Sequence, residues 1–357
     1  MVSFIKRTLY PVSSNLFSRA TLVEGRLKGA QSPFRCLLVG NSAFTEYLKA
    51  RMYEESPVVL QQRRIWIPGL KKLICNKAEH LDLCVAVLPK SYESTFQGLY
   101  EYKCTEEIQQ VIDTSGSWEE VRGRFNSTKR KVSNRIIKRY SLGYRMSDSM
   151  EEFDYFYHRM FVPHTKKRFG ELSSIDSYEE MKEFFLKGRL LFVMKGDQAV
   201  AGALSLVEDG TLVFRRSGVL DGDEAHIEGG GQQALYYFQL KYANEQNLRG
   251  VDTMMSAPFL NDGVHVNKRE WGAALLPDAE AQTWVYFFHA SPSEQIARFF
   301  ENNPIVAHSD KGLRGVIGVS HDMDVSVTEV NDLTRRYHTK GLEGFTIVTS
   351  TGTLCAP

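Results

Sequence analysis

The clearest pattern of apolar and polar positions lies in the middle of the chain. Three apolar runs, 190–195, 199–207 and 211–218, follow one another closely, and the dipeptides Gly196-Asp197 and Asp209-Gly210 separate them. Such dipeptides favour two-residue hairpin turns because glycine and aspartate tolerate positive φ angles. The pattern therefore predicts an antiparallel meander of three strands.

A glycine-rich turn, a helix and one more strand are predicted after the meander. Gly229, Gly230 and Gly231 precede an amphipathic segment at 232–246, and the short apolar run 251–255 follows it. The first amides of a helix have no partner within the helix, so such a turn predicts an anion-binding site. Tight packing of the turn would explain the three glycines equally well. The stretch 261–272 is expected to be a loop rich in titratable groups.

Other elements follow from apolar spacing and capping residues. Ser117 and Glu120 have the spacing of a capping box and predict one helix that runs to about Tyr140. The interval 162–170 is expected to be a basic loop. Further predicted helices are 150–161, 178–186 and 292–302, and further predicted strands are 37–39, 83–88, 283–288 and 315–319.

This order of elements predicts an α/β (α+β) fold with a mostly antiparallel sheet flanked by helices. Four segments are expected: an irregular N-terminal extension (1–35), a degenerate first half (36–116), the main domain (117–320) and a C-terminal extension (321–357). The C-terminal extension is expected to form either an extra strand pair or a tail that packs on a partner.

Composition and charge narrow the class of protein. The chain has 357 residues, 43% of them hydrophobic and 24% charged, with a net charge of +1, which is typical of a soluble globular protein. No apolar run is long enough to span a bilayer, and residues 1–21 lack the core of a secretory signal, so a cytoplasmic location is expected. The five cysteines show no metal-ligand spacing, so reduced thiols and no metal are expected.

The stretch 118–145 is strongly basic. Its nine Lys and Arg residues, against two acids, predict either a helix that faces an anionic ligand or a solvated surface. The nine residues are Arg122, Arg124, Lys129, Arg130, Lys131, Arg135, Lys138, Arg139 and Arg145.

Several short motifs occur in a fixed order between Trp118 and Gly318. They are the basic helix, Phe156-Tyr157, Pro163, Lys167-Arg168-Phe169-Gly170, Gly202, the 229–246 helix with Asn247-Leu248-Arg249-Gly250 and Val251-Asp252, and Lys268-x-x-x-Gly272. In this order the chain resembles the FemABX-type aminoacyltransferases and their relatives with a BioF2-like acetyltransferase domain, a branch of the GNAT acyltransferase fold. The resemblance implies two GNAT-like halves, the first degenerate, and direct attack by an amine without a covalent enzyme intermediate.

The chain also departs from that pattern. Asn267 and Trp271 stand where the family has phenylalanine in its Phe-Lys-x-x-Phe-Gly segment. The helical hairpin that Fem ligases use to contact tRNA is not evident, and the usual GNAT turn is present only as Glu228-Gly-Gly-Gly-Gln-Gln233. Both an aminoacyl-tRNA donor and a CoA donor therefore remain open.

Candidate site residues follow from chemistry and from the resemblance. Proton transfer, oxyanion stabilisation and substrate alignment are the requirements of amide formation. The catalytic candidates are Lys268, Asp252, His226, His265 and Asp262; the donor-binding candidates are Gly229, Gly230, Gly231, Gln232, Arg215 and Arg216; the acceptor-binding candidates are His164, Lys167 and Arg168.

The expected function is N-acyl or aminoacyl transfer to an amine of an anionic small molecule or cell-envelope precursor. No tightly bound cofactor is expected, and acyl-CoA, aminoacyl-tRNA or an acyl-carrier protein are the possible co-substrates. Two alternatives remain: an acetyl-CoA-dependent N-acetyltransferase of small-molecule metabolism, and a non-catalytic GNAT-like module that binds RNA or a protein. The sequence does not indicate an oligomeric state.

Overall fold

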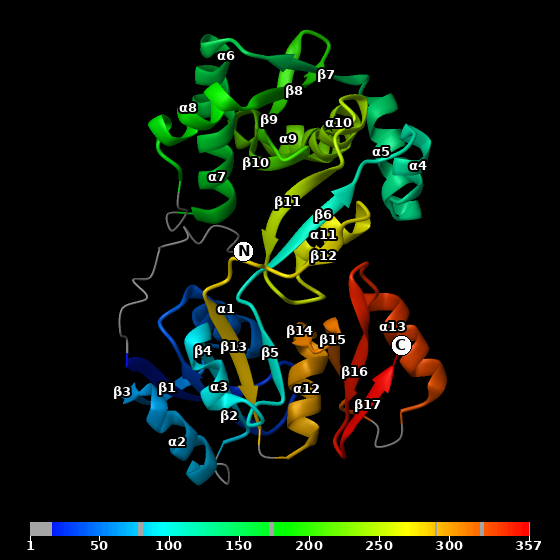
Figure 1. Ribbon diagram of the computed structural model, residues 1–357. Coiled ribbons are helices and arrows are strands. Elements are labelled where there is room, and N and C mark those ends of the chain that lie inside the picture. Colours follow the sequence, from blue (N-terminus) through cyan, green and yellow to red (C-terminus); the bar gives the residue numbers. More distant parts are fainter. Residues whose placement is uncertain (1–15, 78–80, 171–174, 290, 322–324, 357) are drawn as a thin grey trace.

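The computed structural model describes residues 16–77, 81–170, 175–289, 291–321 and 325–356. The strands of this part of the chain form three sheets, with helices packed around them (Figure 1). The mixed α/β class and the predominance of antiparallel pairing that the sequence predicts are confirmed.

The first sheet combines the beginning of the chain with a strand from far along it. Its order is β3 (Val58–Trp66), β1 (Phe17–Arg26), β2 (Pro33–Val39), β4 (Leu83–Pro89), β13 (Thr283–Phe288) and β5 (Tyr102–Cys104). Helices α1 (Ala43–Met52) and α12 (Glu294–Asn302) bury Phe44, Phe299 and Phe300 in one core with Phe34 and Phe287. Short helical segments complete this half: Ile67–Gly69, α2 (Leu70–Lys77), Lys90–Tyr92 and α3 (Glu93–Phe96).

The second sheet contains the predicted meander. Its order is β12 (Ala274–Leu276), β6 (Ile108–Asp113), β11 (Gly250–Ser256), β10 (Thr211–Val219), β9 (Gln198–Glu208), β8 (Arg189–Lys195) and β7 (Leu142–Ser147). Strands β8, β9 and β10 are antiparallel neighbours, as predicted. Helix α10 (Gly231–Glu245) then connects β10 to β11, which runs parallel to β10. Helices α8 (Tyr178–Lys187) and α9 (Glu224–Glu228) and the turn Leu220–Gly222 complete this part.

The third sheet is built from the C-terminal part of the chain. Its order is β14 (Ile305–Ser309), β15 (Gly312–Gly318), β16 (Leu342–Val348) and β17 (Thr353–Ala356), and α13 (Val327–Tyr337) lies between β15 and β16 in sequence. The backbone amide of Leu275 in β12 donates to Lys340 O at 2.8 Å, which joins this sheet to the second one.

The sheets cross the four segment boundaries that the sequence predicts. Strand β1 lies within 1–35 yet belongs to the first sheet, so the prediction of an irregular extension is wrong for residues 17–26. Strand β6 lies within 36–116 but belongs to the second sheet, and β13 lies within 117–320 but belongs to the first. The cause is long-range strand pairing, which local apolar patterns do not report.

The predicted single helix 118–140 is two helices. Helix α4 (Trp118–Gly123) begins with the expected Ser117–Glu120 capping box, and α5 (Ser127–Arg139) begins at Asn126, whose side chain accepts a hydrogen bond from Thr128 N. An asparagine cap ends the continuity because it satisfies the first amides of a new helix. The apolar spacing continues across both helices, so it does not indicate this break.

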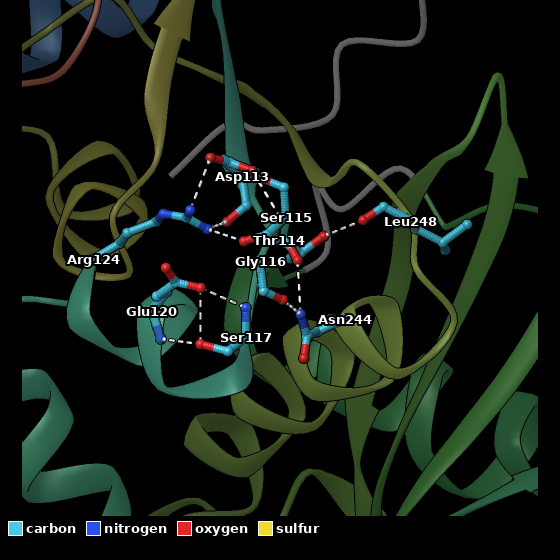
Figure 2. Close-up of polar contacts among 9 residues, drawn as sticks. All are labelled: Asp113, Thr114, Ser115, Gly116, Ser117, Glu120, Arg124, Asn244 and Leu248. Carbon is cyan, nitrogen blue, oxygen red and sulfur yellow. Dashed lines mark hydrogen bonds and ion pairs between the residues drawn. The ribbon is translucent and has the colours of Figure 1, made fainter.

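Figure 2 shows how the end of β6 fixes α4. Arg124 donates to the carbonyl oxygens of Asp113 and Ser115 at 3.1 and 2.8 Å, and Asn244 of α10 donates to Thr114 O and Gly116 O at 2.9 and 2.8 Å. The two long side chains thereby anchor α4 and the C-terminal turn of α10 to the same end of the second sheet.

Two predicted loops are helical. Helix α6 (Met150–Tyr155) continues through a π-helical turn (Phe156–Phe161) into α7 (Val162–Phe169), so 162–169 is not a loop. Pro163 directly follows the π-helical turn, where the α-helical hydrogen-bond pattern is already interrupted. Likewise, Asp262 accepts hydrogen bonds from Val264 N and His265 N and begins α11 (Gly263–Glu270) within the expected loop 261–272.

Glycines bring the helix 150–169 close to the meander. A Cβ atom at Gly202 would lie 2.7 Å from Phe156 Cδ2, and one at Gly218 would lie 2.4 Å from both the backbone carbon and the carbonyl oxygen of Met160. Two positions that exclude larger side chains thus set the distance at which the π-helical turn Phe156–Phe161 lies over β9 and β10.

Gly218→Ala should lower the free energy of unfolding by about 1–3 kcal/mol, because the added methyl group meets backbone atoms that cannot rotate away. Gly143→Ala is the matched control, since a Cβ atom at this strand glycine would have no neighbour within 4 Å. Urea unfolding of both variants measures the difference. Equal stability of the two variants would contradict the close packing of Met160 on β10.

Candidate active site

A cavity of about 960 Å³ lies where β10 and β11 part. The two strands pair in parallel only from Thr211–Gly250 to Val213–Asp252, and beyond this point they share no ladder pairing. Residues 213–217 of β10 and 252–255 of β11 line the cavity, together with residues of α7, α10 and α11. The opening therefore lies between the strands of the sheet that the sequence predicts.

Lys268 fixes the β11 wall of the cavity. Its side chain is 2% exposed, and Nζ donates to Met254 O and Met255 O, both at 2.9 Å. Met254 has φ of 65°, an unfavourable value for a residue with a side chain, and it lies in an irregular stretch where β11 gains a residue against β6. Burial lowers the pKa of Lys268 to about 7, although Asp252, Glu107 and Asp262 oppose this shift.

Asp252 supports the same irregular stretch from the other side. Its carboxylate accepts hydrogen bonds from Met254 N at 2.7 Å and from Gln109 Nε2 at 2.8 Å. Asp252 and Lys268 thus hold the amide and the carbonyl of one strained residue at the cavity wall. This is the role that the structure shows for two of the five catalytic candidates.

The opposite wall comes from α7 and β10. His164, Thr165 and Arg168 line the cavity from α7, while Lys167 does not. Arg215 and Arg216 both line it from β10; Arg215 pairs with Glu208 at 3.0 Å, and Arg216 pairs with Asp176. Adjacent residues of a regular strand point to opposite faces, but a register shift between Phe214 and Arg216 interrupts this alternation, so both arginines line the cavity.

The glycine turn is packed between other elements. Gly230 has φ of 83° and caps α10, and a Cβ atom there would lie 2.1 Å from Ile136 Cγ2 of α5. A Cβ atom at Gly231 would lie 3.0 Å from His226 O and 3.4 Å from Ala201 Cβ. Gly229, Gly230 and Gly231 do not line the cavity, whereas Gln232 and Gln233 at the start of α10 do. The glycines allow this close approach and the left-handed cap.

Three further candidates lie outside the cavity. Asp262 caps α11 and accepts a hydrogen bond from Tyr47 of α1 at 2.7 Å, so it joins the first half of the chain to this helix. His265 is fully buried in α11, and burial lowers its pKa to about 3. His226 lies in α9 and is half-buried. The structure does not bring these side chains together with Lys268 at the cavity.

The sequence did not single out several residues that line the cavity. Gln109 follows from no motif, and Tyr236 lies on a helix whose apolar spacing does not mark it, while Asn267 was noted only as a departure from the family segment. Asp176 was also missed, although its pairing with Arg216 is the most buried ion pair among the described residues. An i, i+4 spacing of Gln232 and Tyr236 on α10 could have indicated a shared helix face.

Several of the nine basic residues of the stretch 118–145 form contacts within the fold. Lys129 donates to Asn267 Oδ1 at 2.6 Å, and Arg122, Arg124 and Arg145 pair with nearby acids. Lys131, Arg135, Lys138 and Arg139 are exposed on α5. Binding of an anionic partner by this helix stays a prediction.

Neither a metal site nor a membrane span is found among the described residues. No group of three or more His, Cys, Asp or Glu side chains there has the arrangement of a metal site. No helix in the described ranges is both long enough and apolar enough to cross a bilayer. The described cysteines Cys36, Cys84, Cys104 and Cys355 are unpaired.

Comparisons with known proteins give remote structural similarities. No family model matches the chain, and no curated protein matches it. FemX is 12% identical with a TM-score of 0.39, covering 75% of this chain and 84% of its own. L-PGS from Bacillus licheniformis is 11% identical with a TM-score of 0.36, covering 79% and 84%. A GCN5-related N-acetyltransferase from Kribbella flavida is 9% identical with a TM-score of 0.27, covering 81% and 58%. Similarities this remote do not identify a reaction, so the candidate chemistry rests on the residues of the cavity.

Lys268→Met should flatten the dependence of stability on pH between about 7 and 10. The folded protein binds the Lys268 proton more weakly than the unfolded chain does, so rising pH in this window removes a cost of folding. Below about 7 that cost is present in full. Urea unfolding at several pH values measures the slope, and Lys167→Met, at an exposed position, is the control. Equal slopes for wild type and Lys268→Met would contradict the buried ammonium.

Proposed function

We propose that this protein is an N-acyltransferase. An acyl donor with an extended, amide-containing arm would lie between β10 and β11, and its acyl group would pass directly to a primary amine in the same cavity. The observation that carries this proposal is the end of the β10–β11 ladder at Val213 and Asp252, with a cavity of about 960 Å³ beyond it.

The unpaired edges of β10 and β11 could bind a ligand with an extended chain. An extended chain with amide groups can pair with strand edges as an added strand would, since main-chain groups supply the hydrogen bonds. Residues 213–217 of β10 and 252–255 of β11 both line this space. Acyl-CoA is the first donor to test, since its pantetheine arm has this chemistry; aminoacyl-tRNA and acyl-carrier protein remain the other proposed donors.

Lys268 is the proposed proton acceptor. In its uncharged form, the amine keeps two hydrogens for Met254 O and Met255 O and has a lone pair left over. A pKa of about 7 makes both protonation states accessible near neutrality, which is the property that a general base needs. The acceptor nitrogen would bond to the acyl carbon and give its proton to Lys268. The carbon–sulfur bond of a thioester would break, and the leaving thiolate would take that proton.

The irregular stretch of β11 fixes the position of Lys268 relative to the β11 backbone. Met254 is held at an unfavourable φ by hydrogen bonds from Lys268 and to Asp252, and such strain persists only where surrounding contacts enforce it. The arrangement therefore places the proposed base and the β11 backbone at a fixed separation, which favours a two-substrate reaction.

Acetyl-CoA at a hundredfold excess over its dissociation constant should raise the free energy of unfolding by about 2.7 kcal/mol, because it binds only the folded state. Ser217→Trp should abolish this stabilisation by filling the cavity between the strands. Gln198→Trp, at an exposed strand position outside the cavity, should retain it. Thermal unfolding with acetyl-CoA and free CoA measures the effect. Binding that Ser217→Trp preserves would place the donor elsewhere.

Lys268→Met should lower the rate of acetyl transfer from acetyl-CoA to hydroxylamine by about 100-fold, because the proton acceptor is lost. Release of free CoA thiol, corrected for the reaction without protein, measures the rate. Lys187→Met is the control at an exposed position on α8. A rate for Lys268→Met within twofold of the wild-type rate would remove Lys268 from the reaction.

A further inference from the structure

His164 has an unusual combination of burial and missing partners. Its side chain is 5% exposed and lines the cavity from α7. Neither ring nitrogen forms a hydrogen bond with a described residue. Neither is among the fully buried atoms that lack a partner, whereas Nδ1 of His265 is. Most buried polar groups have a partner, so an imidazole in this state points to a ligand that supplies one.

The surroundings keep this imidazole uncharged. Burial, followed by the positive charge of Arg168, lowers the pKa of His164 to about 4. Near neutral pH, one ring nitrogen therefore carries a hydrogen and the other is an acceptor. The sequence suggested that His164 helps to bind an anionic acceptor, but a neutral ring contributes no charge to such binding.

Three cationic side chains of the cavity already have partners. Lys268 donates to two carbonyl oxygens, Arg216 pairs with Asp176, and Arg215 pairs with Glu208. His164, in contrast, lines the cavity and has no hydrogen-bond partner among the described residues. Preorganised donors of this kind stabilise the oxygen of a carbonyl that becomes negatively charged during acyl transfer.

We propose that His164 is a catalytic residue that donates its ring N–H to the acyl carbonyl oxygen as the amine attacks. The negative charge that moves onto this oxygen in the tetrahedral intermediate is then shared with a neutral, preoriented donor, and it returns to the carbonyl when the leaving group departs. This role rests on the proposed acyl transfer and adds to it a second residue beside Lys268.

Acetyl transfer from acetyl-CoA to hydroxylamine tests this role in the full-length protein. His164→Phe should lower kcat by about 100-fold and leave both KM values within about twofold, because the donor acts mainly in the transition state. His164→Gln should keep kcat within about tenfold of wild type, because its side-chain amide retains an N–H donor. His158→Gln on the same continuous helix is exposed, lies outside the cavity and should match wild type.

The outcomes separate this inference from the proposed function. If wild type transfers the acetyl group and His164→Phe does so equally fast, the role of His164 is overturned and the proposed function stands. Equal loss in His164→Phe and His164→Gln would also overturn it, since N–H donation would then not be what matters. No transfer by wild type would overturn the proposed function and this inference with it. If His164→Phe unfolds, His164→Ala removes the ring without added volume and gives the same comparison.

Discussion

The parting of β10 and β11 is the constraint on which the rest of the site depends. A parallel pair of strands normally continues its ladder, because unpaired main-chain groups inside a protein are costly. Here the pairing stops at Val213 and Asp252, and β11 takes up an irregular stretch with Met254 at positive φ. The ammonium of Lys268 satisfies two carbonyls of that stretch, and the carboxylate of Asp252 satisfies one amide. Two charged side chains thus replace the missing ladder on one side and keep a cavity open within the sheet.

Lys268 in turn depends on parts of the chain that lie far apart in sequence. Its helix, α11, begins at Asp262, and Tyr47 of α1 donates to the same carboxylate at 2.7 Å. Arg51 of α1 lies over the ring of Phe259, 4.5 Å from its centre, just before α11. On the other side, Lys129 of α5 reaches Asn267 and lies 5.3 Å from the centre of the Trp271 ring. The first half and the basic helix therefore act on the candidate site by fixing α11, whether or not they bind a partner.

Local chemistry explains how much of this could be predicted from the sequence. The meander followed from Gly196-Asp197 and Asp209-Gly210, and α10 with its glycine cap followed from the turn before it, since all of these depend on neighbouring residues. The pairing of β13 with β4 joins residues about 200 positions apart, and no local pattern reports it. Lys268 was named as a candidate, but its contacts with Met254 and Met255 need the folded β11. The neutral state of His164 likewise depends on burial, which a histidine in a basic stretch does not reveal.

The central claim is that the space between β10 and β11 binds an acyl donor next to Lys268. A crystal structure of the protein with a non-hydrolysable acetyl-CoA analogue tests this most directly. The account predicts the pantetheine arm between 213–217 and 252–255, with the acyl carbonyl oxygen within hydrogen-bonding distance of the His164 ring. An analogue bound along the exposed face of α5, with the cavity between the strands empty, would contradict it.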